Sequence, residues 1–446
     1  QSTMKHAPER RFHLHGALLL FYALVGFLFL SACFVLVVQG VESNHHHHHK
    51  KKILVVGSIN ADTFLPVFRL PTEGENLTLR PGEQPMIDVP GGKGCTQAVA
   101  AAKLLCQSSS ESGVVSFVGQ FGNDMASELL QKALTDNKVE LSSSSKVHSQ
   151  LPSGRGYVFL TESGAVSAIV SGGSNAEGWE SWRQKLLSMD QKEQQTNDDD
   201  DPTMISDKEI ESLLEGVQCI LLQREVPEYV NRLVALKAKQ HDHNILILQD
   251  IGGEDRPMDR DMMQACDYII PNETELKRLV KSTILLHQPQ QRQLQQQQSL
   301  PSSSSSLLEI NDDDDDDDDE NLVVKRAKLL QQYGARNVLV TRGSRGSTLV
   351  TEKGDVYHQS ACSVVHVVDE TGAGDCYRAA FAVALVEAKL SLRECMEFAS
   401  AAGSCSVETH GAVPSTPTRD KVQERWENEK STERVINIPR GDGQQQ

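Results

Sequence analysis

The fold is constrained most by a repeated alternation of short apolar runs with longer helix-like segments between residues 52 and 350. Each run contains β-branched residues, is too short for a buried helix and ends in a turn signal, so we predict strands. Strands that alternate with helices form a mainly parallel sheet with helices on both faces. The runs are KILVVGSIN (52–60), VVSFVGQFG (114–122), GVQCILLQ (216–223), NILILQD (244–250), CDYIIPNETE (266–275) and NVLVTRGSRGSTLV (337–350).

Two helices and one hairpin can be predicted between these strands. Residues 90–105 (PGGKGCTQAVAAAKLL) read as a glycine turn followed by an alanine-rich helix, and residues 123–134 as an amphipathic helix. Residues 155–173 (RGYVFLTESGAVSAIVSGG) alternate in polarity and turn at glycine, which is typical of a β-hairpin. The fold class is therefore α/β with a small additional sheet.

Three polar stretches interrupt this pattern at residues 107–112, 191–207 and 288–320. Their Gln, Ser and Asp runs cannot bury enough apolar surface to offset the entropy of ordering, so we predict disordered surface inserts. We expect one domain over residues 52–421, followed by a polar C-terminal tail over 422–446. Without the inserts the domain has roughly 300 residues, which suits one α/β unit with a small sheet.

The net charge of −17 says little about partners, because Asp198–Asp201 and Asp312–Asp319 contribute twelve of the negative charges. No basic face or motif supports nucleic-acid binding. The nine cysteines form no Cys-x-x-Cys pair and have no histidine at zinc-site spacing, so we expect reduced, mostly buried thiols.

Residues 1–51 form a separate N-terminal segment with a basic and histidine-rich linker. Residues 16–38 contain no charge, and as a helix they would span about 35 Å, enough for a hydrocarbon core of about 30 Å. A retained membrane anchor and a cleaved targeting sequence both fit, because the run exceeds a usual signal core but follows basic residues. Basic residues flank it on both sides and give no orientation.

Polar residues and glycines follow the predicted strands where an open α/β sheet binds its ligands. Asp62 ends GSINAD (57–62) and can accept hydrogen bonds from two adjacent sugar hydroxyls. The glycines of PGGKG (90–94) allow close approach of a ligand to the backbone. Glu225 follows the strand 216–223. Asn272 and Glu275 in PNETE are three apart and suited to hold Mg²⁺ through water.

The most specific stretch is VVDETGAGDCYRAAF, residues 367–381. By itself it fits either a tight turn with a helix-capping aspartate or a phosphate-binding turn with a catalytic base at Asp375. The order of the motifs decides between these two interpretations, since VTRGSRG (340–346) also supplies a glycine-rich loop suited to a nucleotide.

In this order the motifs resemble those of the ribokinase-like (PfkB) carbohydrate kinases, from Ile53 to Pro417 with the inserts left out. GGKG…QAVAAA and TGAGD are the family's most specific signatures. The resemblance implies a ribokinase-like fold with a mainly parallel sheet flanked by helices. It also implies a small β lid, from segments near 63–90 and 155–173, that serves as a homodimer interface.

The resemblance further implies ATP-dependent phosphorylation of the 5-hydroxyl of D-ribose, with Asp375 as the base, Mg²⁺ as cofactor and K⁺ as activator. The implied anion hole is Gly372, Ala373 and Gly374, with the N–H of Asp375. The implied sugar ligands are Asn60, Asp62, Gly92, Lys93, Thr96, Glu225 and Asp375. The implied ATP site is Asn272, Thr341, Gly343, Gly346, Gly374 and Ser400. Glu275 would hold Mg²⁺ through water, and Asp369, Thr371, Ser406, Thr409, Gly411 and Ser415 would surround K⁺.

The sequence departs from the family pattern at four places. Thr96 stands where an asparagine is usual, which puts the sugar contact in doubt, and Arg342 replaces an aliphatic residue. Tyr377-Arg378 predicts bulkier packing after the glycine turn, and Ser400 lies where the family often has Asn or His. Another sugar or nucleoside (deoxyribose, fructose or adenosine) therefore stays open as substrate, as does a non-catalytic, membrane-tethered sugar-binding protein.

Because a kinase needs ATP, we expect the domain to face the cytosol, anchored or free, or to lie inside an ATP-containing organelle such as a plastid. Residues 16–38 would provide any membrane association.

Overall fold

The computed structural model describes residues 51–105, 113–162, 166–190, 203–297 and 320–436. They all belong to one compact unit, residues 50–446. The prediction of an anchor or targeting segment at 16–38 falls outside this part of the chain. Among the described residues no helix is both long enough and apolar enough to cross a bilayer.

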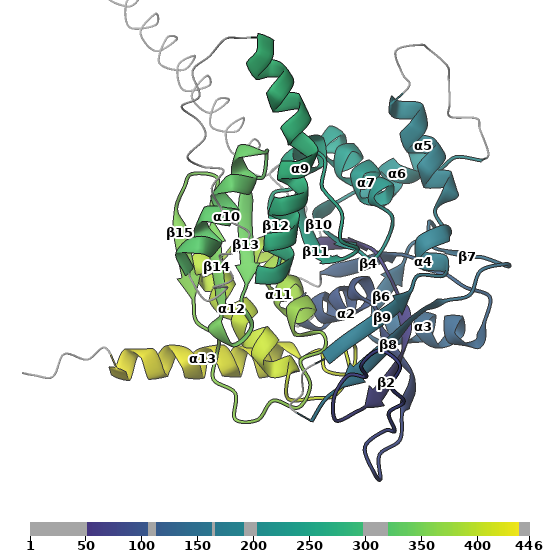
Figure 1. Cartoon of the computed structure of the whole chain (residues 1–446), viewed down its shortest axis with the longest axis vertical. Coiled ribbons are helices and arrows are strands. Elements are labelled where there is room, and N and C mark those ends of the chain that lie inside the picture. Colours follow the sequence, from purple (N-terminus) through teal and green to yellow (C-terminus); the bar gives the residue numbers. More distant parts are fainter. Residues whose placement is uncertain (1–50, 106–112, 163–165, 191–202, 298–319, 437–446) are drawn as a thin grey trace, which may run out of the picture. The chain divides into compact units, whose positions relative to one another are not determined.

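A nine-stranded sheet forms the centre of the unit (Figure 1). Seven neighbouring strands are parallel, and the last two strands extend the sheet antiparallel beyond them. The mainly parallel sheet is thus confirmed. In spatial order the strands are β6 (Val139–Leu141), β4 (Val114–Val118), β1 (Lys52–Val56), β10 (Val217–Arg224), β11 (Leu246–Gly253), β12 (Tyr268–Ile270), β13 (Asn337–Thr341), β14 (Ser347–Val350) and β15 (Val356–Gln359).

The two faces of this sheet pack against separate helical layers. In β1, Ile53 and Val55 join one hydrophobic core, whereas Leu54 and Val56 join the other. Such alternation follows from the two-residue period of a strand. The first layer contains α2 (Lys93–Leu105), α3 (Met125–Asp136), α11 (Ala373–Glu387), α12 (Leu392–Ser406) and α13 (Arg419–Ile436). The second contains α5 (Glu180–Asp190), α6 (Asp207–Leu214), α7 (Glu228–His241), α8 (Arg260–Ala265), α9 (Glu273–Gln297) and α10 (Glu320–Gln332).

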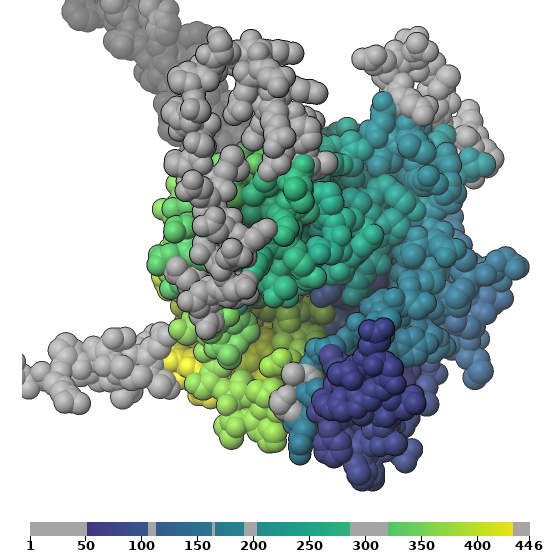
Figure 2. Space-filling model, viewed as in Figure 1, coloured from purple at the N-terminus to yellow at the C-terminus, as the bar shows by residue number. Residues whose placement is uncertain are grey.

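A second, four-stranded sheet forms the predicted lid. Its order is β3 (Met86–Gly91), β2 (Asn60–Pro66), β8 (Gly154–Leu160) and β9 (Val166–Ser171), and β8 and β9 pair antiparallel as the predicted hairpin. Its first strands belong to the purple lobe that projects from the body in Figure 2. All of β9 is exposed. Because β2 follows β1 directly, the lid stands at the carboxyl edge of the main sheet.

Helices reach into the regions that we predicted as inserts and as a polar C-terminal tail. Helix α13 crosses the predicted domain boundary at residue 421, and its Val422 and Trp426 are buried. Trp426 packs edge-on against Phe398 of α12, with ring centroids 5.6 Å apart. Helix α6 begins at Asp207, the last residue of the predicted insert 191–207. Helix α9 continues to Gln297 and so includes the first residues of the predicted insert 288–320. Residues 107–112, 191–202 and 298–319 lie outside the described residues.

Candidate active site

Asp375 lies in the first turn of α11, and its N-cap Gly372 has φ +81°, a left-handed conformation that favours glycine. The N–H of Ala373 donates to the carbonyl of Glu370 at 3.2 Å. The N–H groups of Gly372, Gly374 and Asp375 have no hydrogen-bond partner among the described residues. A helix start leaves such donors available to an anion. Of the four predicted anion-hole donors, three are therefore open.

The carboxyl of Asp375 is held by Gln97 of α2. Gln97 donates from Nε2 to Oδ1 of Asp375 at 2.9 Å and to Oδ2 of Asp250 at 3.0 Å. Gln97 is itself fixed by Gln223, whose Nε2 donates to its Oε1 at 2.8 Å. All three partners are buried. Residues in the carboxyl-terminal halves of β10 and β11 thus support the side chain that orients the predicted base.

Two cations balance the carboxylates around Asp375. Lys93 lies with Nζ 3.8 Å from Oδ2 of Asp250, and Arg378 with Nη2 3.1 Å from Oδ1 of the same carboxylate. Burial raises the pKa of Asp375 to about 6, with Asp250 adding to the rise and Lys93 and Arg378 opposing it. Burial lowers the pKa of Lys93, but the carboxylates of Asp250, Asp375 and Glu275 outweigh it and raise the pKa overall.

The predicted sugar ligands come from the lid and from the start of α2. Asp62 of β2 is buried between the backbones of Gly91 and Gly156, where any Cβ would lie within 2.3 Å of its carboxylate. Burial, together with the charge of Glu225, raises the pKa of Asp62 to about 7. Glu225 accepts from Ser58 Oγ at 2.6 Å and from the N–H of Lys93 at 3.0 Å.

Asn60 and Gly92 adjoin this pair at the hinge between the main sheet and the lid. The Oδ1 of Asn60 accepts from Asn175 Nδ2 at 2.8 Å, so the amide is oriented by α4 (Ser174–Glu177). Gly92 has φ +85°, and a Cβ there would lie 2.9 Å from the N of Asn60. Backbone contact between the two segments therefore requires glycine at position 92.

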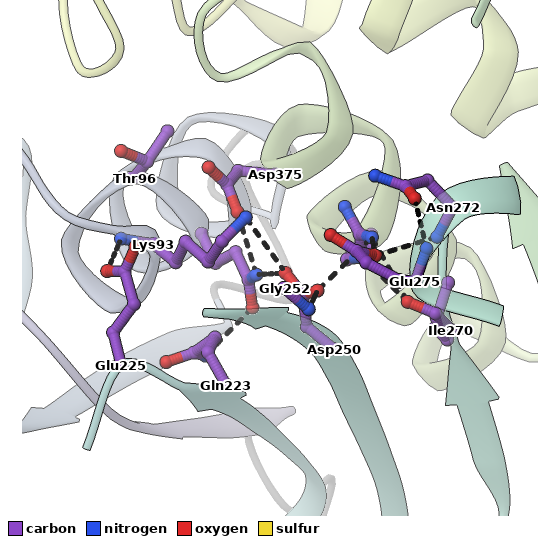
Figure 3. Close-up of polar contacts among 12 residues, drawn as sticks. Lys93, Thr96, Gln223, Glu225, Asp250, Gly252, Ile270, Asn272, Glu275 and Asp375 are labelled. Atoms are coloured by element: carbon purple, nitrogen blue, oxygen red, sulfur yellow. Dashed lines mark hydrogen bonds and ion pairs between the residues drawn. The ribbon is translucent and has the colours of Figure 1, made fainter. Parts of the chain in front are cut away.

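Thr96 does not take the place of an asparagine amide. Its hydroxyl donates to the carbonyl of Gly92 at 3.0 Å, and the side chain is fully buried. Figure 3 shows it on the same helix as Lys93, in the first turn of α2. Its only hydroxyl proton is donated to the residue before α2, and the side chain has no exposed surface, so Thr96 offers a sugar no donor.

The predicted nucleotide residues lie at the neighbouring strand ends. Asn272 forms a parallel β-bridge with Thr341, which ends β13. Asn272 and Glu275 also cap α9 reciprocally, since the N–H of Asn272 donates to Glu275 Oε2 at 2.7 Å and the N–H of Glu275 to Asn272 Oδ1 at 2.8 Å (Figure 3). Capping therefore accounts for part of the PNETE pattern.

The loop after β13 turns on Gly343 and Gly346, both with positive φ. A Cβ on Gly346 would lie 1.9 Å from the carbonyl oxygen of Gln359, which excludes other residues there. Arg342 of this loop is buried and forms ion pairs with Glu273 at 2.8 Å and Glu320 at 3.2 Å. Its charge is thus compensated between α9 and α10.

Ser400 lies on α12, where its Oγ accepts from the N–H of Cys362 at 3.2 Å and donates to the carbonyl of Ser360 at 3.1 Å. It ties α12 to the segment that follows β15. Gly403, one turn along α12, lies against Ala373, since a Cβ there would be 3.3 Å from the Ala373 carbonyl oxygen. The α12 residues therefore border the start of α11.

The predicted K⁺ residues come from two loops that meet beside Gly372. Buried Asp369 accepts from the N–H of Thr371 and of Gly411, both at 2.8 Å. The Oγ1 of Thr371 is buried and has no partner among the described residues. Thr409 donates its N–H to the carbonyl of Ser406 at 3.1 Å. Ser406 and Ser415 donate their hydroxyls to the carbonyls of Gly403 and Ala412, each at 2.8 Å.

Four polar residues of the site escaped sequence reasoning: Gln97, Gln223, Asp250 and Arg378. Gln97 lies inside the GGKGCTQ motif, and Asp250 and Gln223 end predicted strands, so the rule that selected Asp62 would also have selected them. We expected Tyr377 and Arg378 to make bulky packing contacts after the glycine turn, but both side chains make polar contacts. Tyr377 hydrogen-bonds Ser347 through its hydroxyl at 2.8 Å, and Arg378 is the counterion of Asp250.

Comparison with known proteins agrees with this geometry. Residues 50–419 match the model of the pfkB family carbohydrate kinases. The ribokinase of Arabidopsis thaliana is 34% identical over 373 residues, which cover 83% of this chain and 79% of that protein. The ribokinase of Haemophilus influenzae is 27% identical, with 83% and 96% covered.

The structural comparison gives the same result. A structure of the Arabidopsis thaliana ribokinase complexed with ribose and ATP superposes with a TM-score of 0.62 at 30% identity, covering 84% of this chain and 98% of that one. A ribokinase structure from Thermotoga maritima gives 0.59 at 27% identity, with 85% and 100% covered. The ribokinase-like fold is thereby confirmed, and the chain belongs to the pfkB family of carbohydrate kinases.

Proposed function

We propose that this protein is an ATP-dependent ribokinase, which transfers the γ-phosphoryl group of ATP to the 5-hydroxyl of D-ribose and gives ribose 5-phosphate and ADP. The observation that carries the proposal is the position of Asp375. Its carboxylate lies between the sugar-side residues of α2 and the lid and the open N–H groups at the start of α11. Relatives that are named ribokinase, one of them bound to ribose and ATP, support this substrate pair.

In this proposal Asp375 accepts the proton of the 5-hydroxyl as that oxygen attacks the γ-phosphorus. The bond from phosphorus to the bridging oxygen of ADP breaks at the same time. The N–H groups of Gly372, Gly374 and Asp375 stabilise charge on the transferring group, because donors fixed before the reaction need no reorganisation. Asp62 and Glu225 accept hydrogen bonds from the other hydroxyls and orient the sugar.

Magnesium would be held at Asn272 and Glu275, mostly through water. Among the described residues no three His, Cys, Asp or Glu side chains form a metal cluster. Mg²⁺ keeps several waters and binds with substrate phosphates, so a single carboxylate and an amide fit it. When bound, the ion would neutralise charge on the phosphates of ATP.

Potassium would bind between the loops 369–371 and 406–415. The buried Oγ1 of Thr371, which has no partner in the described part of the chain, and the hydroxyl oxygens of Ser406 and Ser415 are neutral oxygen donors. Asp369 supplies the negative charge. A Cβ on Gly372 would lie 3.1 Å from the Cα of Ala412. Order in the second loop would therefore be transmitted directly to the turn that carries the anion hole.

The test is ADP release by the purified chain with Mg²⁺ and K⁺, compared between ribose, deoxyribose, fructose and adenosine. Asp375→Asn keeps the shape of the side chain and removes the base, so we expect a loss of at least about 100-fold in kcat. The proposal is supported if the wild-type chain prefers ribose and Asp375→Asn is inactive. Equal ATP turnover with and without ribose would contradict it.

Another sugar or nucleoside is the second candidate, and Thr96 favours it, because its hydroxyl proton is committed to Gly92. If ribose is the substrate, Thr96→Asn should lower KM for ribose by restoring an amide donor. If Thr96→Asn lowers KM for ribose while the wild type prefers another compound, Thr96 has changed the substrate specificity of this chain away from ribose. Sugar binding without phosphorylation by the wild type would favour the non-catalytic alternative.

Two further properties belong to the proposal. The lid strands expose Tyr157 and Ile169, which are register partners on β8 and β9 and so share one face, suited to a homodimer interface. Sedimentation of the chain and of Ile169→Lys would test dimerisation. Residues 16–38 would provide membrane association or organelle targeting, and a fusion of residues 1–52 to a fluorescent protein would separate anchoring, import and secretion.

A further inference from the structure

Arg378 follows the predicted base by three residues and folds back over the first turn of α11. Helical side chains point toward the N-terminus of their helix, so a residue lies above the one four positions earlier. A Cβ on Gly374 would lie 2.5 Å from Nη1 of Arg378. The guanidinium therefore occupies the space that a side chain at position 374 would fill, directly beside the open N–H groups.

One edge of this guanidinium is fixed. Nη2 donates to the carbonyl of Ile270 at 3.0 Å and lies 3.1 Å from Oδ1 of Asp250, and Nε donates to the same carbonyl at 3.3 Å. Glu275 Oε2 lies 3.8 Å from Nη2. The side chain is only 4% exposed. Such contacts leave the guanidinium a single orientation.

The other edge has unused donors. Each arginine Nη carries two N–H groups, and Nη1 of Arg378 has no hydrogen-bond partner among the described residues. Nη1 is not one of the fully enclosed, unpartnered polar atoms of the described residues, so part of its surface is open. The free edge adjoins Gly374, whose N–H is one of the open donors of the turn.

Charge neutralisation of Asp250 does not account for this arrangement. Asp250 already has Lys93 as a second cation at 3.8 Å and Gln97 as a neutral donor at 3.0 Å. An arginine placed only to balance Asp250 would not need a side-chain-free residue at 374. A triphosphate bound at the turn would add several negative charges beside Asp250, Glu275 and Asp375.

From these contacts we propose that Arg378 is a further catalytic residue, whose Nη1 donates a charge-assisted hydrogen bond to the transferring phosphoryl group. The inference rests on the proposed function. Arg378 keeps its protons throughout the reaction, since the hydroxyl proton goes to Asp375 and the electron pair of the broken bond goes to ADP. Its contribution is a fixed positive charge, which stabilises the transition state more than bound ATP.

The experiment is a double-mutant cycle on the purified full chain with the variants Arg378→Gln, Asp250→Asn and both together, following kcat, KM for ATP and the melting temperature. We expect Arg378→Gln to lower kcat about 100-fold, as for loss of one fixed donor, with KM for ATP changed less than about fivefold. The same substitution should still lower kcat at least about 30-fold in the Asp250→Asn background.

An arginine that acts only as the counterion of Asp250 gives the opposite pattern. Once Asp250 is neutral, removing Arg378 would leave kcat unchanged, so equal kcat values for Asp250→Asn and the double variant would overturn the inference. Arg419→Gln is the matched control, because Arg419 pairs with Glu387 at the far end of α11, at 2.7 Å. It should lower the melting temperature and leave kcat unchanged.

The outcome also separates this inference from the proposed function. A wild-type chain that releases no ADP with any sugar would overturn both. The other result is a wild-type chain that phosphorylates ribose, with Arg378→Gln lowering kcat when residue 250 is aspartate but not when it is asparagine. That result would overturn only the role of Arg378.

Discussion

The Nε2 of Gln97 lies 2.9 Å from Oδ1 of Asp375, so the predicted base on α11 is oriented by a side chain of α2 that is 278 residues away in the sequence. The same Nε2 donates to Asp250, and Gln223 holds the amide in the required direction. The first and last signature motifs of the sequence are thereby joined by one hydrogen bond.

Gln97→Met should therefore leave Asp375 poorly oriented and more often protonated, without emptying the core. The hydrogen bond from Gln97 lowers the pKa of Asp375, so its loss should raise that pKa further and move the acidic limb of kcat to higher pH. We expect kcat at neutral pH to fall about tenfold. Gln331→Met, which removes a half-buried amide on α10, is the control, and an unchanged pH profile in Gln97→Met would contradict the orienting role.

The pH profile of kcat/KM for ribose should show two acidic groups. Asp62 and Asp375 act as acceptors only when deprotonated, and burial raises their pKa values to about 7 and about 6. Activity should thus be present above pH 7 and fall with slope one between pH 7 and 6 and slope two below it. Asp62→Asn should leave one limb near pH 6. A flat profile between pH 5 and 7 would contradict these assignments.

The sequence predicts the strands, the lid and the loops of the site because these depend on local patterns. Apolar runs of strand length ended by Gly or Asp locate the sheet edge, and Glu225, Asn272 and Thr341 lie along it. Gln97, Asp250 and Arg378 depend on long-range contacts. Their importance comes from burial beside other charges, which no local pattern contains. Thr96 shows the same limit, since the bond to Gly92 is visible only in the folded helix.

Gly374→Ala should lower kcat through Arg378. An added Cβ would lie 2.5 Å from Nη1, so the guanidinium must move, while helical backbone at this position tolerates alanine. We expect a kcat loss of about tenfold with the melting temperature preserved. In the Arg378→Gln variant, Gly374→Ala should lower kcat only slightly. An equal fall in kcat in the wild type and in Arg378→Gln would show that the added methyl group acts on the turn itself and not through Arg378.

Trp426→Ala should destabilise the domain, which would place its boundary beyond residue 421. The indole is buried on Phe398, donates to Glu397 Oε2 at 3.1 Å and carries Lys430 over its face at 4.0 Å. Loss of a buried tryptophan costs about 3 kcal/mol, measurable by urea unfolding. Trp426→Phe should cost less. Equal stability of a chain that ends at residue 421 would show that α13 is dispensable.

Thr371→Val tests whether the Oγ1 of Thr371 is a ligand of K⁺. Valine has nearly the same shape as threonine but lacks Oγ1, the buried oxygen that has no partner among the described residues. Without a cation, removing an unsatisfied hydroxyl should leave the protein as stable or slightly more stable, since a buried polar group without a partner costs free energy. With K⁺ present, the variant should need about tenfold more K⁺ for half-maximal ADP release, because one ligand is lost. Ser415→Ala is the matched comparison, since its hydroxyl already donates to Ala412 and its loss should also reduce stability. Activation by K⁺ at the same concentration in Thr371→Val and the wild type would show that Oγ1 is not a ligand and that the ion, if it acts, binds elsewhere.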